Sequence, residues 1–163
     1  MPLSLKTESP EATQDLGRSI AAFLRPNDVL LLCGDLGAGK TEFTQGVALG
    51  LGISEPVNSP TFNLLLVHRL PAAQAGRPHS LYHFDLYRLD EARQLEDLDY
   101  CAMLEDGAVS LVEWGDRFAE ALPEDGLKVE ITMLSGERRQ FDFLALGEQG
   151  ESLLAAWRES DGN

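Results

Sequence analysis

The chain has 163 residues and a formal net charge of −14, with 44% hydrophobic and 25% charged residues. This length and composition predict one domain over residues 1–163 with a packed core, and they argue against a disordered chain. Because 27 acidic residues outnumber 13 basic ones, most of the surface repels a polyanion, so strong autonomous nucleic-acid binding is not expected.

No apolar run approaches the roughly 20 residues that a membrane helix needs. Residues 1–9 lack the basic flank and apolar stretch of a secretory signal, so we expect a cytoplasmic protein without a membrane segment. Cys33 and Cys101 have no metal-binding spacing and are expected to be reduced thiols with structural roles.

The first part of the chain predicts a helix, a buried strand and a second helix. Ser9 is a good N-cap and Pro10 a good first helical residue, so the first helix is expected to run to about Arg25. Residues 29–33 are a short continuous apolar run, which is typical of a buried parallel strand. A glycine-rich turn follows this strand, and the second helix is expected to begin at Lys40.

The rest of the chain predicts further strands with short connections. The expected elements are a strand at 61–68, an exposed loop at 70–78, a strand at 81–87, a short solvated helix and loop at 90–106, a strand at 108–112, a hairpin of residues 128–134 and 140–146, and a last helix at 153–157. This order predicts a three-layer α/β fold with a mostly parallel central sheet and an antiparallel C-terminal hairpin.

The main chemical motif is GDLGAGKT, from Gly34 to Thr41, which matches the pattern G-x-x-x-x-G-K-[ST] between a predicted strand and helix. Glycine lets triphosphate oxygens approach the backbone, where N–H groups and the helix N-terminus bind them. Lys40 is expected to reach the β- and γ-phosphates as a catalytic residue, and the Thr41 hydroxyl to coordinate Mg²⁺. We therefore predict a P-loop ATPase with ATP and Mg²⁺ as its ligands; the alternative is a glycine-rich turn with a surface lysine. The predicted phosphate-binding residues are Asp35, Leu36, Gly37, Ala38, Gly39, Lys40 and Thr41.

Two acidic residues are candidates for the metal. Glu113 follows an apolar strand, as a Walker B carboxylate does, and Asp85 lies in the strand at 81–87. A carboxylate that is even partly buried is costly unless it meets a cation. We predict that both acids share the metal site and that Asp85 also positions the metal shell or the attacking water. The alternative is that each acid caps its strand or pairs with an arginine such as Arg88.

Three further residues have two interpretations each. Thr61, in the segment SPTF, follows the P-loop helix and is predicted to sense the γ-phosphate or its metal, unless this segment is only a rigid entry into a strand. His83 is interpreted as a core or boundary residue rather than a catalytic base. Trp114 either stacks on the nucleotide or a partner, or belongs to the core.

Four motifs occur together in one order: GDLGAGKT at Gly34, SPTF at Ser59, LYHFDLYRL at Leu81 and LVEWGDR at Leu111. In this combination the chain resembles the TsaE (YjeE) family over about residues 9–146. These bacterial ATPases support the formation of threonylcarbamoyladenosine in tRNA. The resemblance implies a weak ATPase that acts with the TsaB and TsaD subunits, which attach a threonylcarbamoyl group to N6 of adenosine 37 in tRNAs reading ANN codons.

The resemblance also implies roles for individual residues. It implies that Lys40, Thr41, Asp85 and Glu113 hold or process MgATP, and it places Thr61 in a switch-like loop. It brings the N-terminal segment, including Thr13, near the adenine.

The chain departs from the family pattern at two positions. Glu42 stands where many members have a second threonine. The family's hairpin arginine, which approaches the nucleotide, is ambiguous in the segment Gly136 to Arg139, and Arg138 is the candidate here.

Three other functions share the first motif. A small-molecule P-loop kinase would need an acceptor site or an arginine-rich lid, and neither is apparent in the sequence. A GTPase would need an NKxD-type guanine reader, and none is present. A non-hydrolysing nucleotide-dependent adaptor would engage a partner through the acidic residues 90–106.

Overall fold

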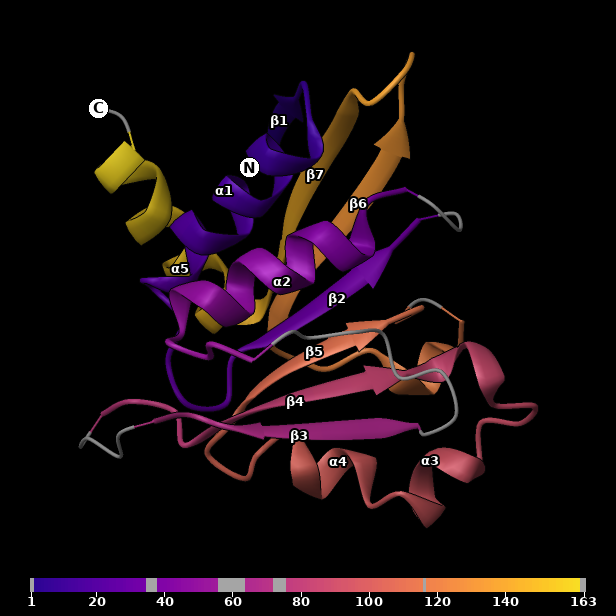
Figure 1. The fold of residues 1–163 in the computed structure, drawn as a ribbon. Coiled ribbons are helices and arrows are strands. Elements are labelled where there is room, and N and C mark those ends of the chain that lie inside the picture. Colours follow the sequence, from indigo (N-terminus) through magenta and orange to yellow (C-terminus); the bar gives the residue numbers. More distant parts are fainter. Residues whose placement is uncertain (1, 35–37, 56–63, 72–75, 116, 162–163) are drawn as a thin grey trace.

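The computed structural model describes residues 2–34, 38–55, 64–71, 76–115 and 117–161 (Figure 1). Within these residues, seven strands form one sheet in the order β1-β7-β6-β2-β5-β4-β3. The strands are β1 (Leu3–Thr7), β2 (Val29–Cys33), β3 (Leu65–Arg69), β4 (Ser80–Asp85), β5 (Val109–Glu113), β6 (Gly126–Met133) and β7 (Arg139–Leu146).

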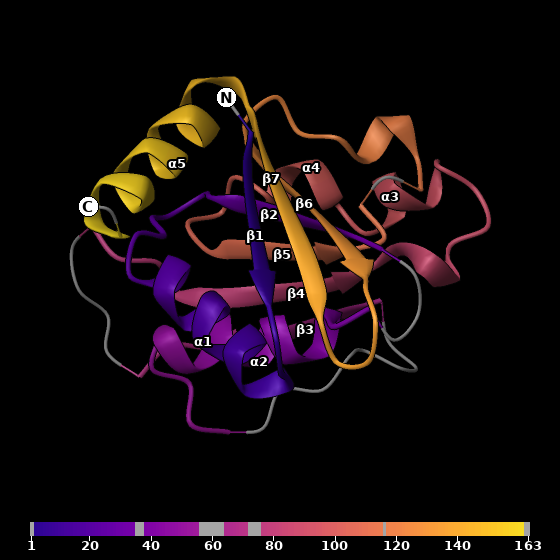
Figure 2. The same ribbon diagram turned by 90° about the horizontal axis from the view of Figure 1, so that it is seen from above.

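The centre of the sheet is parallel and its margins are antiparallel. The neighbours β6, β2, β5 and β4 run parallel to one another, whereas β1 pairs antiparallel with β7, β7 with β6, and β3 with β4. This topology confirms the predicted parallel centre and the antiparallel C-terminal hairpin of β6 and β7 (Figure 2). Figure 2 also shows β1 lying alongside β7 at the sheet margin, a strand that the sequence analysis did not predict.

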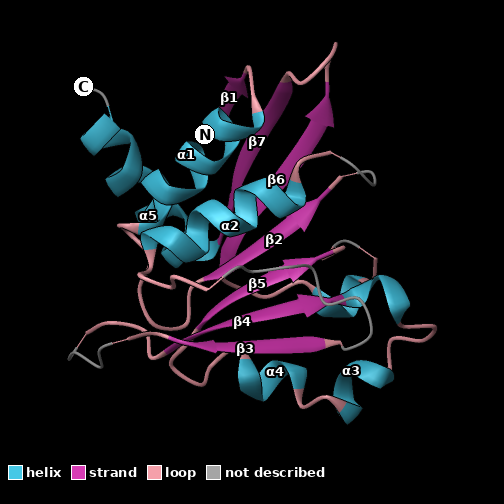
Figure 3. Ribbon diagram, viewed as in Figure 1, coloured by secondary structure: helices cyan, strands magenta, loops and turns pink. Residues whose placement is uncertain are grey.

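Helices cover the sheet on both faces, which confirms the three-layer α/β fold (Figure 3). The helices are α1 (Pro10–Ala21), α2 (Lys40–Gly50), α3 (Gln94–Asp97), α4 (Tyr100–Met103) and α5 (Gly147–Asp161), with two 3₁₀ turns, η1 (Leu86–Arg88) and η2 (Ala119–Ala121). Across the described ranges, no helix combines the length and apolar character that crossing a membrane requires.

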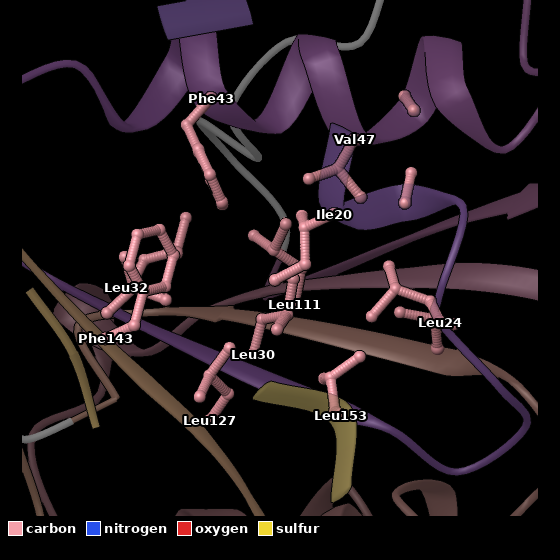
Figure 4. Close-up of a cluster of buried hydrophobic side chains, with 14 of the residues drawn as sticks. Ile20, Leu24, Leu30, Leu32, Phe43, Val47, Leu111, Leu127, Phe143 and Leu153 are labelled. Atoms are coloured by element: carbon pink, nitrogen blue, oxygen red, sulfur yellow. The ribbon is translucent and has the colours of Figure 1, made fainter. Parts of the chain in front are cut away.

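Two hydrophobic clusters lie on opposite faces of β2 because its side chains alternate. Leu30 and Leu32 belong to the cluster that contains α1, α2 and α5, whereas Val29 and Leu31 belong to the cluster that contains α4. Figure 4 shows Phe43 of α2 pointing from its helix toward the sheet in the first cluster. A strand buried on both faces explains why residues 29–33 are continuously apolar.

Close packing between α1 and α2 sets the position of the P-loop helix. A Cβ atom at Gly46 of α2 would lie 2.0 Å from the carbonyl oxygen of Gln14, and one at Gly17 of α1 would lie 2.3 Å from that of Phe43. Only glycine permits this approach of two helix backbones. These contacts hold α2 close to α1, so they help to determine where the first turn of α2 stands above the sheet.

Several element boundaries differ from the predictions for local reasons. The first helix ends at Ala21 rather than near Arg25, because the Asp28 carboxylate accepts a hydrogen bond from the Arg25 backbone N–H at 2.7 Å and stabilises a turn. The strand predicted at 81–87 ends at Asp85, whose Oδ1 accepts from the Tyr87 N–H at 3.0 Å and caps η1.

Other differences concern helix lengths and the loops. The single short helix expected at 90–106 is two helices, α3 and α4, separated by Asp99 with a left-handed φ of 53°. The last helix is much longer than the predicted 153–157. Residues 61–63 of the predicted strand and 72–75 of the predicted loop lie outside the described residues.

Candidate functional site

The glycine-rich turn joins β2 to α2 at the carboxyl end of the parallel strands. Gly39 is the N-cap of α2 and has a φ of 109°, a conformation that favours glycine. A Cβ atom at Gly34 would lie 2.6 Å from the Ile131 carbonyl oxygen, so this turn also passes close to β6. Ala38 is buried beside it. The predicted phosphate-binding residues Asp35, Leu36 and Gly37 lie outside the described residues.

Lys40 is the first residue of α2 and is buried, with 6% exposure. Its Nζ donates a hydrogen bond to the Gly34 carbonyl oxygen at 2.5 Å and lies 4.3 Å from the ring centroid of Trp114. A buried ammonium needs such partners, because desolvation of a charge is costly. The predicted catalytic lysine therefore bonds back to Gly34 at the end of β2, and it precedes the exposed Thr41 at the start of the helix.

The two predicted metal ligands lie side by side on adjacent strands. In the parallel pairing of β4 with β5, Asp85 is in register with Glu113, and in the pairing of β2 with β5, Leu32 is in register with Glu113. Strand alternation places Glu113 on the same face as Leu111, which packs in the cluster that includes α2. Both acids thus stand at the strand ends from which the P-loop leaves the sheet, where ligands bind in open α/β sheets.

The donor set fits a magnesium–nucleotide site better than an all-protein metal cage. The described residues contain no group of three or more His, Cys, Asp or Glu side chains arranged to hold a metal ion. Mg²⁺ in nucleotide sites takes one or two carboxylates, and substrate phosphates and water complete its octahedral shell. Asp85 and Glu113, neighbours at the P-loop end of the sheet, suit that requirement.

His83 is a core residue, because only 1% of it is exposed, which confirms its interpretation as a core or boundary residue. Its ring contacts Glu113: Nε2 of His83 lies 2.5 Å from Oε2 of the carboxylate. Nδ1 of His83 is buried, and none of the described residues forms a hydrogen bond with it. On the same face of the neighbouring strand β3 lies His68, whose pKa is lowered by burial and by the nearby His83.

Trp114 follows Glu113 in an uncommon backbone conformation, with a φ of 61°. Its backbone N–H donates to the Leu32 carbonyl oxygen at 2.9 Å, which ties this turn to the end of β2. The indole lies 4.9 Å from the ring of Tyr87, centroid to centroid, and also faces Lys40. Trp114 is therefore half-buried in an aromatic pair at the mouth of the site, and its stacking on a nucleotide stays a prediction.

Comparison with known proteins identifies the family of the chain. A family model described as "Threonylcarbamoyl adenosine biosynthesis protein TsaE" matches residues 7–141. The chain belongs to the TsaE family. TsaE of Bacillus subtilis is 40% identical over 154 residues, covering 93% of this chain and 90% of its own, and TsaE of Streptomyces coelicolor is 41% identical over 141 residues, covering 83% and 92%. The crystal structure of B. subtilis YdiB is similar to this TsaE-family chain with a TM-score of 0.78 and 33% identity, covering 99% of this chain and 97% of YdiB.

The hairpin arginines of this TsaE-family chain have different surroundings. Arg138, the candidate from the sequence, places its Nε 3.1 Å from the Glu8 carboxylate and is 43% exposed. Arg139 lies against the P-loop, since a Cβ atom at Gly39 would be 3.7 Å from Cγ of Arg139. Strand alternation explains why Arg139 lies against the P-loop: its side chain is on the same face of β7 as Phe141, and that face packs against α2.

For two other predicted nucleotide contacts of this TsaE-family chain, Thr13 and Thr61, the role stays a prediction. Thr13 is buried in α1, and its hydroxyl forms a 2.7 Å hydrogen bond with that of Thr7. Its contribution to adenine binding stays a prediction. Thr61 lies outside the described residues, as does the side chain of Arg88, the alternative partner of the acids.

Proposed function

We propose that this chain is the ATP-binding and ATP-hydrolysing component of the machinery that forms N6-threonylcarbamoyladenosine at position 37 of tRNAs reading ANN codons. In this proposal it acts in the cytoplasm with TsaB and TsaD. The relatives named "tRNA threonylcarbamoyladenosine biosynthesis protein TsaE" support the process. The observation that carries the ATPase proposal is the convergence of Lys40, at the start of α2, with the registered pair Asp85 and Glu113 at the same end of the sheet.

Different residues of the chain have different roles in the proposed phosphoryl transfer. Backbone amides of the P-loop and the N-terminus of α2 bind triphosphate oxygens, and Lys40 exchanges its bond to the Gly34 carbonyl for contacts with them. Thr41, Asp85 and Glu113 would hold Mg²⁺, which when bound neutralises charge on the β- and γ-phosphates. Asp85, half-buried at its strand end, orients the attacking water or the metal's water shell.

We further propose Arg139, rather than Arg138, as the hairpin arginine that contacts the nucleotide, because its side chain packs against Gly39. Arg139→Ala is expected to weaken ATP binding by about tenfold, since a lost charge-assisted hydrogen bond costs about 1.5 kcal/mol. Isothermal titration calorimetry with ATP and Mg²⁺ measures this change. Arg138→Ala is the matched comparison and should change the affinity by less than about twofold, because exposed ion pairs such as that with Glu8 contribute little. A larger loss in Arg138→Ala would reverse the assignment.

The proposed process is tested by reconstituting tRNA modification with TsaB, TsaD, a threonylcarbamoyl donor and ATP. Over several turnovers, threonylcarbamoyladenosine should accumulate with the wild-type chain and stop after about one turnover without it or with Lys40→Ala. Modification that proceeds equally in all three reactions would remove the chain from this process. Phosphate release in the same mixtures distinguishes an ATPase from a nucleotide-dependent adaptor, because an adaptor releases no phosphate with or without TsaB and TsaD.

A further inference from the structure

The pair formed by His83 and Glu113 has a polar contact that the P-loop mechanism does not use. Both side chains are buried, with 1% and 4% exposure, on the adjacent strands β4 and β5. His83 is in register with Leu111, so Glu113 lies two residues further along the same face, and the ring and the carboxylate meet diagonally between the strands. The contact of 2.5 Å joins Nε2 to Oε2.

The direction of this hydrogen bond follows from the two groups. An ionised carboxylate can only accept, so the imidazole donates from Nε2–H. Nδ1 has no partner within the described part of the chain, so the bond to Glu113 is the hydrogen bond that orients the ring. A buried donor, Nε2–H of His83, therefore holds one carboxylate oxygen, Oε2, of the predicted metal ligand Glu113.

We propose that His83 is a positioning residue that holds the Glu113 carboxylate ready for the magnesium of a bound nucleotide. A glutamate side chain has several rotatable bonds, and Glu113 ends its strand immediately before a residue with a left-handed φ. A fixed hydrogen bond reduces the conformational freedom that must be lost when such a ligand engages a metal, and donors behind metal ligands typically strengthen metal binding by 10- to 100-fold. The inference rests on the proposed function, since it concerns the same magnesium–nucleotide site.

The competing explanation is that His83 only satisfies a buried carboxylate and stabilises the fold. The two explanations differ in what a substitution changes. A positioning role affects the Mg²⁺ dependence of nucleotide binding and leaves binding of metal-free ATP intact. A structural role lowers the stability of the protein, and any effect on nucleotide affinity is the same with and without Mg²⁺.

The experiment compares His83→Leu, which removes the donor, with His83→Gln, whose side-chain amide donates from a similar distance. Calorimetric titrations with ATP at a series of Mg²⁺ concentrations give the Mg²⁺ requirement, which is the Mg²⁺ concentration at which the gain in ATP affinity is half complete. Titrations with ATP in EDTA give the metal-free affinity. For His83→Leu we expect a 10- to 100-fold higher Mg²⁺ requirement and a metal-free affinity within about twofold of wild type. His83→Gln should restore the Mg²⁺ requirement to within about threefold of wild type.

His68→Leu is the matched control, because this histidine lies on the same face of β3 and its Nε2 makes no hydrogen bond to a described residue. It should leave the Mg²⁺ requirement unchanged. If His83→Leu does not fold, His83→Asn replaces it: its shorter amide reaches the position of Nδ1 but not that of Nε2, so it should show the loss that Gln repairs. In the Glu113→Gln background, His83→Leu should add little, since the two residues act through one contact.

Each result decides between the explanations. An unchanged Mg²⁺ requirement in the His83 variants, an equal loss of metal-free affinity, a failure of Gln to restore binding, or additivity with Glu113→Gln would overturn the positioning role. If the wild-type chain binds ATP with no dependence on Mg²⁺, the proposed function fails together with this inference. If the wild type depends on Mg²⁺ and His83→Leu matches it, only the inference fails.

Discussion

Replacement of Lys40 by alanine is expected to lower ATP turnover on the order of 1,000-fold. The Lys40 ammonium is buried at the start of α2 and is held within the P-loop by the Gly34 carbonyl oxygen, so its removal takes away a preorganised positive charge where the phosphates bind. Loss of one such group from a water-poor site typically costs 10²- to 10³-fold in rate. Phosphate release under saturating ATP, with TsaB and TsaD present, measures the effect.

Lys128→Ala is the control for this substitution. Lys128 pairs with Glu130 at 3.2 Å on β6, and strand alternation places it on the sheet face opposite α2. Lys128 has the same charge as Lys40 but lies on the face of the sheet away from the P-loop helix. ATP turnover by Lys128→Ala should therefore equal that of the wild type. Normal ATP binding and hydrolysis by Lys40→Ala would require the whole phosphate-site assignment to be abandoned.

Asp85→Asn should lower ATP turnover by about 100-fold while the protein stays folded. Asp85 caps η1 and has a proposed role at the metal, and this substitution separates the two. Its Oδ1 accepts a hydrogen bond from the Tyr87 N–H, and an asparagine oxygen can keep that cap. The negative charge is lost, however, and with it the proposed attraction for Mg²⁺ and the orientation of its water. Urea unfolding and phosphate release, measured on the same preparation, separate the two effects.

The expected change in unfolding free energy for Asp85→Asn is within about 0.5 kcal/mol, as for substitutions that keep their structural contacts. Asp142→Asn serves as the control, because this carboxylate accepts from the Ser4 hydroxyl across β1 and β7, far in the strand order from β4. Its turnover should be unchanged. If Asp85→Asn hydrolyses ATP at the normal rate, Asp85 has no role at the metal, and Glu113 is the one acid left for it beside Thr41. If the variant unfolds, the cap is the main role of Asp85.

The elements around the P-loop could be predicted from local sequence because their signals are local. Residues 29–33 are apolar on both faces, and the structure gives β2 those bounds. The start of the next helix follows from the glycines and Lys40, and α2 begins there. The strand β1 was missed although Leu3 and Leu5 alternate with polar residues, because a five-residue strand at a chain terminus is stable only when a neighbour such as β7 supplies its hydrogen bonds.

The candidate site needed more than local patterns. The alternating pattern at 81–87 predicted a strand for Asp85, and the apolar run at 108–112 predicted the strand that Glu113 follows, but their placement side by side is a matter of strand register. The choice between Arg138 and Arg139 also depends on register, because a shift of one residue moves each side chain to the other face of the sheet. The packing of β7 against α2, through Phe141 and Phe43, places Arg139 on the face beside Gly39, which favours it as the proposed arginine.

By itself, the sequence determined the fold class and the family resemblance, and it indicated the P-loop motif and two candidate metal-binding acids, since each follows from residue types at short or ordered spacings. The tertiary structure alone decided which groups touch: Lys40 with Trp114, Arg139 beside Gly39, and His83 with Glu113. The physical reason is that contacts between strands far apart in the chain depend on pairing order and register, and these result from burying both faces of the sheet at once rather than from any single segment.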